Sequence, residues 1–206
     1  MRYHLEKPKG TDTYCYSPRE VSAMVDHCHG KPVLVWLGAV IVALAHTGLR
    51  IGELANLRWS DVDLNRRIIR VGDERSSRRK KAAGTFRTTK GRRARTIPIH
   101  SRLLQLLKNM ERKPDGWVFH AQRGGRLWPR NVLEAFIAGV IEPLKKRFPT
   151  PMGEIGFEHG RLHSFRHFFC SQSFLGGASE GEIREWLGHA DSQMVEHYRH
   201  LRSEDA

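Results

Sequence analysis

Along most of this chain, apolar residues recur among polar ones with the spacing expected of helices. Ser17, Pro18 and Glu20 form the pattern of a capping box, with the serine as N-cap, and predict a helix over Pro18–His29. The next segment, Lys31–Thr47, is long and apolar and predicts a buried helix that Gly48 ends. Further helices are expected over Gly52–Arg58, Ser101–Met110, Arg130–Phe148 (whole, or broken near Pro143), Ser164–Leu175, Ser179–Leu187 and Ser192–Arg202.

The pattern changes to short runs with strand character in the middle of the chain. Strands are expected over Arg66–Val71, Thr85–Thr89 and Arg95–Ile99. A turn around Gly91 joins the last two, and Pro98 favours an edge position for the last. The charged segment Gly72–Gly84 has no apolar period, so we expect a mobile loop there. The sum predicts an α+β fold, mostly helical, with a small three-stranded antiparallel sheet.

Composition places the chain among soluble globular proteins that bind polyanions. Apolar residues make up 39% and charged residues 28% of its 206 residues. No apolar run reaches the roughly 18 residues that span a bilayer, and the N-terminus lacks the apolar core of a signal peptide. We therefore expect a cytoplasmic protein. The net charge of +13 favours nucleic acid as partner. An acidic membrane surface is the second candidate, but no basic amphipathic helix or lipidation signal supports it.

Two sets of cysteine and histidine residues have the side chains that a metal site would need. The three cysteines are odd in number and include no Cys-x-x-Cys pair, which favours free thiols. A zinc site from Cys15, His27, Cys28 and His29 would need adjacent ligands, which rarely fit one tetrahedron. A second set, His159, His163 and His167, has helical spacing, but Gly160 and the Ser164 cap interrupt the helix. No metal and no cofactor are predicted.

Four separated segments carry the residue types of a chemical site. They are Thr47–Leu54 with Arg50 and Glu53; Lys90 in a basic hairpin; His163-Ser164-Phe165-Arg166-His167; and Leu187-Gly188-His189, with Tyr198 nine residues later. Two arginines can hold the nonbridging oxygens of a phosphodiester with forked donors. A tyrosine hydroxyl can attack phosphorus and form a covalent intermediate, and a lysine or histidine can protonate the leaving oxygen.

The charge of these segments suits activation of a tyrosine. With an ordinary pKa of about 10, forming tyrosinate at neutral pH costs roughly 4 kcal/mol. His163 as a base, or the field of Arg50 and Arg166, offsets part of that cost and stabilises charge on the phosphoryl group. No acidic cluster in these segments suits a pair of metal ions, which argues against two-metal nuclease chemistry.

Each residue alone also has a purely structural explanation. Arg50 and Glu53 have the spacing of a helical ion pair. His163 precedes a capped helix, and His189 and Tyr198 have the surroundings of packed side chains. Only their combination and order favour a catalytic interpretation.

In that combination the segments resemble the motifs of the tyrosine recombinases, the phage-integrase family, from about Ser17 to Leu201. The resemblance assigns Arg50, Lys90, His163, Arg166 and His189 to the family's catalytic positions, with Tyr198 as nucleophile and Glu53 as a supporting residue. It implies a site-specific recombinase or integrase that cleaves and rejoins double-stranded DNA without metal or ATP. Tyr198 would form a 3′-phosphotyrosine, and Lys90 would protonate the departing 5′-oxygen. The alternatives are type IB topoisomerase-like strand relaxation and a non-catalytic DNA-binding remnant of a mobile element.

The chain departs from the family pattern at both ends and in one loop. Residues 1–16 resemble a tail or linker remnant, and 17–206 a catalytic domain without the family's N-terminal core-binding domain. Arg199–Ala206 is short for an exchanged helix, so we expect a monomer without DNA and allow for a tetramer on recombination sites. Localisation would be cytoplasmic and nucleoid-associated. DNA contacts are expected from the long basic insert and the following turn: Arg75, Arg78, Arg79, Lys80, Lys81, Arg92 and Arg93.

Overall fold

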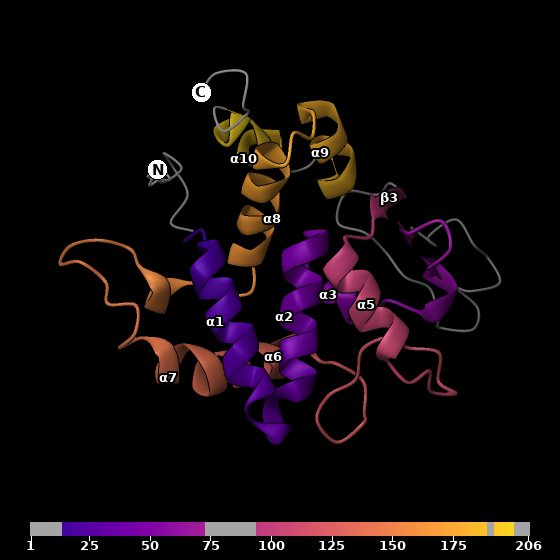
Figure 1. The fold of residues 1–206 in the computed structure, drawn as a ribbon, viewed down its shortest axis with the longest axis horizontal. Coiled ribbons are helices and arrows are strands. Elements are labelled where there is room, and N and C mark those ends of the chain that lie inside the picture. Colours follow the sequence, from indigo (N-terminus) through magenta and orange to yellow (C-terminus); the bar gives the residue numbers. More distant parts are fainter. Residues whose placement is uncertain (1–13, 73–93, 189–191, 200–206) are drawn as a thin grey trace.

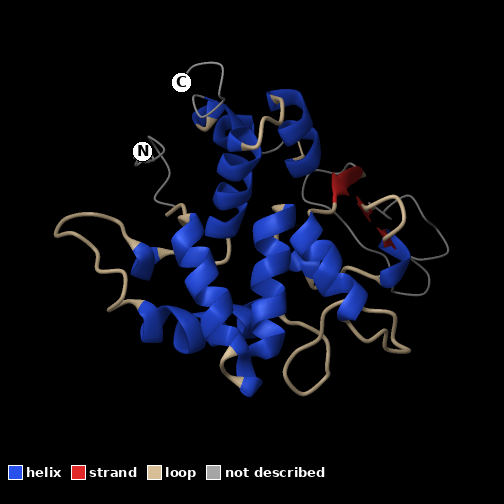
Figure 2. Ribbon diagram, viewed as in Figure 1, coloured by secondary structure: helices blue, strands red, loops and turns tan. Residues whose placement is uncertain are grey.

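The computed structural model describes residues 14–72, 94–188 and 192–199. The expected strand Thr85–Thr89, the basic insert with the turn after it, Lys90 and His189 lie outside these ranges. Within them the chain is mostly helical, as predicted (Figure 2). None of the helices in these ranges has both the length and the apolar character required to cross a membrane.

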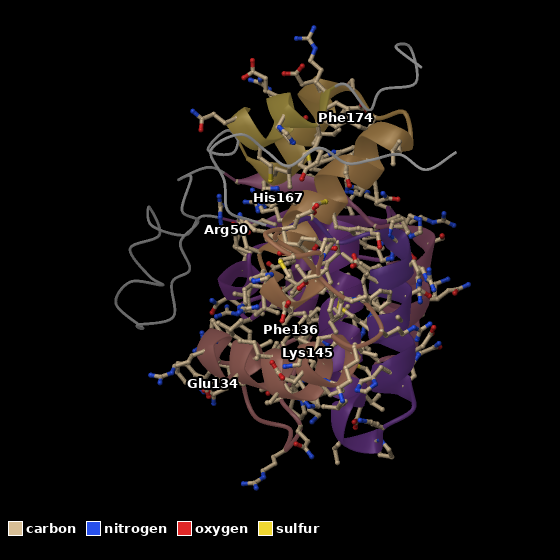
Figure 3. The ribbon with its side chains drawn as sticks, turned by 90° about the vertical axis from the view of Figure 1, so that its left-hand side faces the viewer. Arg50, Glu134, Phe136, Lys145, His167 and Phe174 are labelled. Carbon is tan, nitrogen blue, oxygen red and sulfur yellow. The ribbon has the colours of Figure 1, made fainter. Side chains whose placement is uncertain are left out.

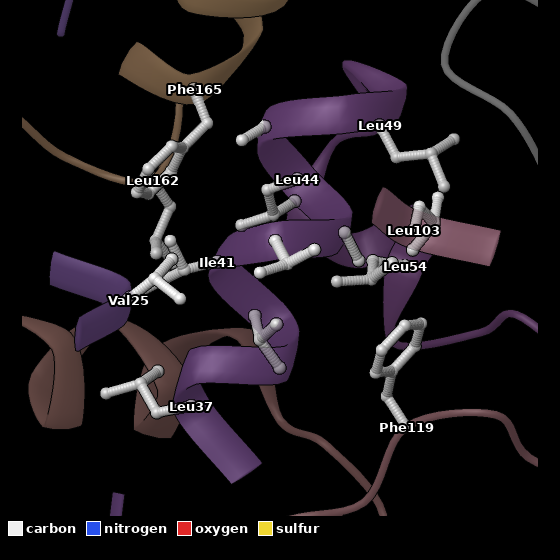
Figure 4. Packing of buried hydrophobic residues seen from close by; sticks show 14 of the residues in the cluster. Val25, Leu37, Ile41, Leu44, Leu49, Leu54, Leu103, Phe119, Leu162 and Phe165 are labelled. Carbon is white, nitrogen blue, oxygen red and sulfur yellow. The ribbon is translucent and has the colours of Figure 1, made fainter. Parts of the chain in front are cut away.

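Helix α2 (Val35–Thr47) is the centre of the fold, with α1 (Pro18–His29) on one side and α5 (Ser101–Asn109) on the other (Figure 1). Its side chains are buried in all directions. Ile41 lies towards Val25 of α1 and Leu162, while Leu103 and Phe119 approach from the opposite side (Figure 4). A helix covered on all sides needs no polar face, which explains the long apolar run in the sequence.

The capping signals located several helix ends correctly. Helix α1 has the predicted bounds, because Ser17 Oγ accepts from the Glu20 N–H at 3.3 Å and Glu20 Oε2 accepts from the Ser17 N–H at 2.7 Å. Gly48 ends α2 in the left-handed conformation, with φ 61°. Two starts differ from expectation: a 3-10 turn at Pro32–Leu34 precedes α2, and α3 is a short helix over Ile51–Leu54.

The helix expected over Arg130–Phe148 is continuous to Leu144 but contains a π-helical stretch. Helix α6 (Pro129–Phe136) passes through the π turn Ile137–Ile141 into α7 (Glu142–Leu144). Pro143 has no N–H to donate to the Gly139 carbonyl, and that carbonyl instead contacts His27 Nε2 of α1 at 2.9 Å. The proline therefore locally rearranges the helix rather than breaking it.

The sheet contains β1 (Val62–Asp63), β2 (Ile68–Val71) and β3 (Arg95–Pro98), antiparallel in that order. Ile69 pairs with Ile97, and both are buried against the helical core. The second and third correspond to predicted strands, and in the described residues β3 is at the edge, as Pro98 indicated. The two-residue β1 is too short to give a sequence signal.

Three helices at the C-terminal end lie together at one end of the molecule (Figure 1). They are α8 (Ser164–Leu175), α9 (Glu180–Leu187) and α10 (Ser192–His197). The predicted capping box starts α9, with Ser179 Oγ accepting from the Glu182 N–H. A small buried cluster, separate from the main core, holds these helices together and includes Phe174, Ile183 and Tyr198.

Candidate active site

Arg50 lies just beyond the point where α2 ends. It is the N-cap of α3, and its N–H donates to Glu53 Oε2 at 2.9 Å. Its guanidinium lies 3.9 Å from the other Glu53 oxygen, and its side chain is 20% exposed. The sharp turn before it needs Gly48, where an added Cβ would lie 2.6 Å from Phe169 and Leu187. The end of α2 is therefore in close contact with α8 and α9.

Arg166 of α8 joins two helix ends inside the protein. The side chain is 1% exposed, and its two terminal nitrogens donate to the carbonyls of Gly48 and Leu187. These carbonyls end α2 and α9, where intrahelical donors run out. Because Gly48 is two residues before Arg50, this bond brings the two predicted arginines to the same corner of the fold.

Glu53 holds a third arginine that the sequence did not single out. Arg95 of β3 donates to Glu53 Oε2 at 2.7 Å and, through Nε, to the Trp186 carbonyl at 2.8 Å. Both side chains are more than 90% buried. Burial alone raises the pKa of Glu53, but the hydrogen bond and charge of Arg95, with help from Arg50 and Arg166, outweigh it and lower that pKa. Glu53 is therefore an anion that ties α3 to the sheet and to α9.

Tyr198 is buried, with 1% of its surface exposed. Its hydroxyl lies 3.3 Å from His167 Nδ1 and within hydrogen-bonding reach of the Cys15 thiol. Burial, Cys15 and Cys170, in that order, raise its pKa well above the ordinary value. The free protein therefore holds this hydroxyl in its neutral form.

His163 and His167 occupy successive turns at the start of α8. Their rings are 5.4 Å apart, and the His167 ring is 6.0 Å from that of Tyr198. His163 is exposed at the N-cap of α8, whereas His167 is buried. Figure 3 places Arg50 and His167 towards the same end of the molecule. The sequence pattern placed His167 in the same candidate segment as His163 and Arg166 but gave it no catalytic role. Its helical spacing from His163 is the signal that could have linked it to the site.

The described residues thus bring together five of the predicted positions in two neighbouring groups. Arg50, Glu53 and Arg166 meet at the end of α2, while His163 and Tyr198 meet beside His167. The residues outside the described ranges are Lys90, His189, Arg75, Arg78, Arg79, Lys80, Lys81, Arg92 and Arg93. Consecutive residues of α8, Arg166 and His167, connect the two groups.

Neither histidine set converges on a metal position in the described part of the chain. No three Cys, His, Asp or Glu side chains are grouped there to hold an ion. His159 Nδ1 accepts from the Gly156 N–H at 3.2 Å, and His27 contacts Gly139. All three cysteines are free thiols.

Comparison with known proteins identifies the family to which this fold and corner belong. The model of the phage integrase family matches residues 16–205, and the chain belongs to this family. The sequence is 32% identical over 164 residues to the tyrosine recombinase XerC of Bacillus licheniformis, covering 79% of this chain and 48% of the relative. It is 25% identical over 217 residues to a tyrosine recombinase XerC-like protein of Caldanaerobacter subterraneus subsp. tengcongensis, covering 93% and 51%.

The likeness to solved structures confirms the expected fold. The Tn1549 transposon integrase, in complex with transposon right end DNA, superposes with a TM-score of 0.70 at 22% identity, covering 95% of this chain and 64% of that one. The chain spans about half the length of the curated relatives it matches.

Proposed function

We propose that this chain is the catalytic domain of a site-specific recombinase that cleaves and rejoins double-stranded DNA through a 3′-phosphotyrosine at Tyr198. The observation that carries the proposal is the corner where Arg166, bonded to Gly48, adjoins the Arg50 turn while the next residue of α8 contacts Tyr198. Membership of the phage integrase family supports the same chemistry. The greater length of the relatives supports a further, DNA-clamping domain in the whole protein.

In this proposal the two arginines have different tasks. Arg50 is partly exposed and directs its forked donors at the nonbridging oxygens of the scissile phosphate. Arg166 is buried, so its charge is fixed in place and needs no reorganisation as negative charge grows on phosphorus. Glu53 and Arg95 hold the Arg50 turn against the sheet.

Tyr198 supplies the nucleophile after it leaves its buried position. Its oxygen attacks phosphorus, the bond to the 5′-oxygen breaks, and Lys90 protonates that oxygen. The tyrosine proton passes to His163 or, through the existing contact, to His167. His189 and the predicted basic residues complete the phosphate and DNA contacts. Because the covalent link conserves the ester, a 5′-hydroxyl of a partner duplex reverses the step.

Trapping of the covalent intermediate tests this function. Nicked or suicide duplexes incubated with the protein should give a DNA adduct that withstands denaturing electrophoresis. Tyr198→Phe should give none while still binding DNA. Absence of an adduct from the wild-type protein on every substrate would overturn the proposal. Relaxation of supercoiled plasmid without strand exchange would instead indicate topoisomerase-like activity.

The oligomeric and cellular parts of the proposal follow from the same chemistry. We expect a monomer in solution, with tetramers formed on paired recombination sites in the nucleoid of the cytoplasm. Light scattering of the DNA-free protein checks the first expectation, and a stable tetramer there would contradict it.

A further inference from the structure

A stack of alternating arginine and tryptophan side chains lies on the surface beyond α3. Arg58 and Arg126 each hold their guanidinium 4.9 Å from the centre of the Trp117 ring. Arg126 is also 5.5 Å from the ring of Trp128, which is 60% exposed. We call these four residues the Arg–Trp surface. The attraction between a guanidinium and the face of an indole ring orients these side chains as well as packing them.

The backbone beneath the Arg–Trp surface is held at several points. Isolated β-bridges pair Arg58 with Trp117 and His120 with Arg126. Leu127 is buried between the exposed Arg126 and Trp128, which anchors this loop in the core. The Arg–Trp surface is therefore a platform whose backbone is fixed by these contacts, and not a group of flexible side chains.

Hydrogen bonds connect this platform to the Arg50 turn. Arg126 donates to Asn56 Oδ1, and Asn56 Nδ2 donates to the Gly52 carbonyl at 2.6 Å. Gly52 is in the first turn of α3, and that turn begins directly after the N-cap Arg50. Apart from its chain neighbours and the backbone of α3 itself, no atom of the described residues lies within 4 Å of a Cβ built on Gly52, so among these residues this side of α3 is open. A ligand bound at Arg50 would thus extend naturally towards the Arg–Trp surface.

We propose that the Arg–Trp surface binds the sugar–phosphate backbone of the duplex beside the scissile phosphate. This inference rests on the proposed function, because it takes the DNA at Arg50 as its starting point. A guanidinium carries its donors in the plane of the group, so a face stacked on an indole still directs N–H groups outward, in forks that match phosphate oxygens. The exposed indole of Trp128 adds an apolar contact for a deoxyribose.

The charges of the surrounding loop favour a polyanion over a protein partner with mixed charges. Arg123 and Arg130 are exposed near Arg126 in the sequence, and Arg130 pairs with Glu134. The acidic Asp115 of the same loop is engaged by His120 at 2.9 Å. The surface therefore presents mainly cations, as phosphate contacts require.

The salt dependence of DNA binding tests the proposal. Binding of a duplex of about 30 base pairs is measured against salt concentration in a Tyr198→Phe background, which prevents covalent trapping. If Arg126 neutralises one phosphate, Arg126→Gln should lower the slope of log K against log salt by about 0.9. Trp128→Ala should weaken binding several-fold with an unchanged slope.

Arg147→Gln is the matched control. Arg147 is exposed and also stacks on an aromatic ring, that of Phe148 at 5.6 Å, but it follows α7 in the chain, whereas most of the Arg–Trp surface follows α5. Helices α7 and α5 lie on opposite sides of α1 and α2 (Figure 1). Replacement of Arg147 should leave slope and affinity unchanged. Equal slopes for Arg126→Gln and the parent would overturn the proposal, as would an equal loss in the Arg147 variant.

A parallel experiment separates this proposal from the proposed function. Adduct formation on suicide duplexes is measured with Tyr198 present. An adduct from the wild-type protein, together with an unchanged slope for Arg126→Gln, rejects the Arg–Trp surface alone. A changed slope without any adduct rejects the enzymatic function and supports the surface. Unfolding temperatures of Arg126→Gln and Trp128→Ala should match that of the parent, because both side chains are exposed.

Discussion

Arg166 and His167 are consecutive residues of α8, yet the two halves of the site that they serve differ in kind. On the arginine side, buried hydrogen bonds join Arg166 to the ends of α2 and α9, and Glu53 to β3. On the tyrosine side, Tyr198 directly follows the six-residue helix α10, and its hydroxyl faces His167 of α8 and Cys15. In the proposed function, the first half is assembled before substrate arrives, whereas Tyr198 must leave its buried position before it can react.

The difference shows that binding a phosphate and holding a nucleophile place different demands on the two halves of such a site. A phosphate-binding corner gains from rigidity, because fixed charges stabilise a transition state without reorganising. A nucleophile kept buried and neutral is protected from reaction until the substrate supplies the energy to release it. The two halves can be tested separately, because a variant in one half of the site leaves the other half intact.

Replacement of Arg166 should have the largest effect on stability. Arg166→Ala leaves the Gly48 and Leu187 carbonyls without this donor and opens a cavity, so the free energy of unfolding should fall by about 4 kcal/mol. Urea denaturation measures the loss. Arg161→Ala is the matched control, because Arg161 also donates to two carbonyls, of Glu158 and Gly160, but is exposed. Similar losses for both variants would contradict a preassembled arginine corner.

Replacement of Glu53 should have an intermediate and pH-dependent effect. Glu53→Gln weakens the charged hydrogen bond to Arg95 and should cost about 2 kcal/mol at neutral pH. Because the folded-state pKa of Glu53 is lowered, its contribution is present above the ordinary value of 4.5 and is lost as pH falls through the folded pKa. The stabilities of the variant and the wild type should therefore converge in acid.

Unfolding midpoints measured from neutral to acidic pH check this convergence. Glu134→Gln provides the comparison, since Glu134 pairs with Arg130 on the surface and should change stability little at any pH. A Glu53→Gln curve parallel to that of the wild type would show that the ion pair does not hold the arginine side together.

Removal of the Tyr198 hydroxyl should have the smallest effect at neutral pH. Tyr198→Phe loses one hydrogen bond to His167, worth less than about 1 kcal/mol. The raised pKa of Tyr198 means that its contribution is complete below the ordinary value of about 10 and is lost as pH rises towards the folded pKa. The wild type should therefore lose stability more steeply than the variant in alkaline solution. Identical alkaline profiles would indicate that Tyr198 is already accessible in the free protein.

Local signals in the sequence predicted much of the helical framework. The capping boxes at Ser17 and Ser179 and the left-handed Gly48 depend on residues within four positions of each other, and all three were located correctly. Pro143 indicated a possible break in the helix expected over Arg130–Phe148, but not that the helix would continue through a π turn. The Gly139 carbonyl that the proline leaves without its helical donor contacts His27, more than a hundred positions away in the chain. Long-range contacts of this kind leave no periodic trace.

The residues of the candidate site also fall into those that sequence motifs select and those that only long-range contacts reveal. Motif resemblance selected Arg50, Arg166 and Tyr198, and the fold brings the two arginines to one corner. It did not select Arg95, since a strand arginine is ordinarily exposed and its burial depends on Glu53 and Trp186 from other segments. The sequence allowed Tyr198 to be a packed side chain, but it did not indicate that Cys15 would pack against the same cluster, because Cys15 belongs to a segment expected to be a linker.

Three separate structural requirements coincide at Gly48. Its conformation ends a helix, its missing side chain admits Phe169 and Leu187, and its carbonyl receives Arg166. A substitution would oppose all three at once, whereas a Cβ added to Gly52, four residues later, would meet open space among the described residues. A survey of all single variants should therefore find neighbouring glycines at opposite ends of the tolerance scale. The spacing of three helices is set by the one residue that contributes no side chain.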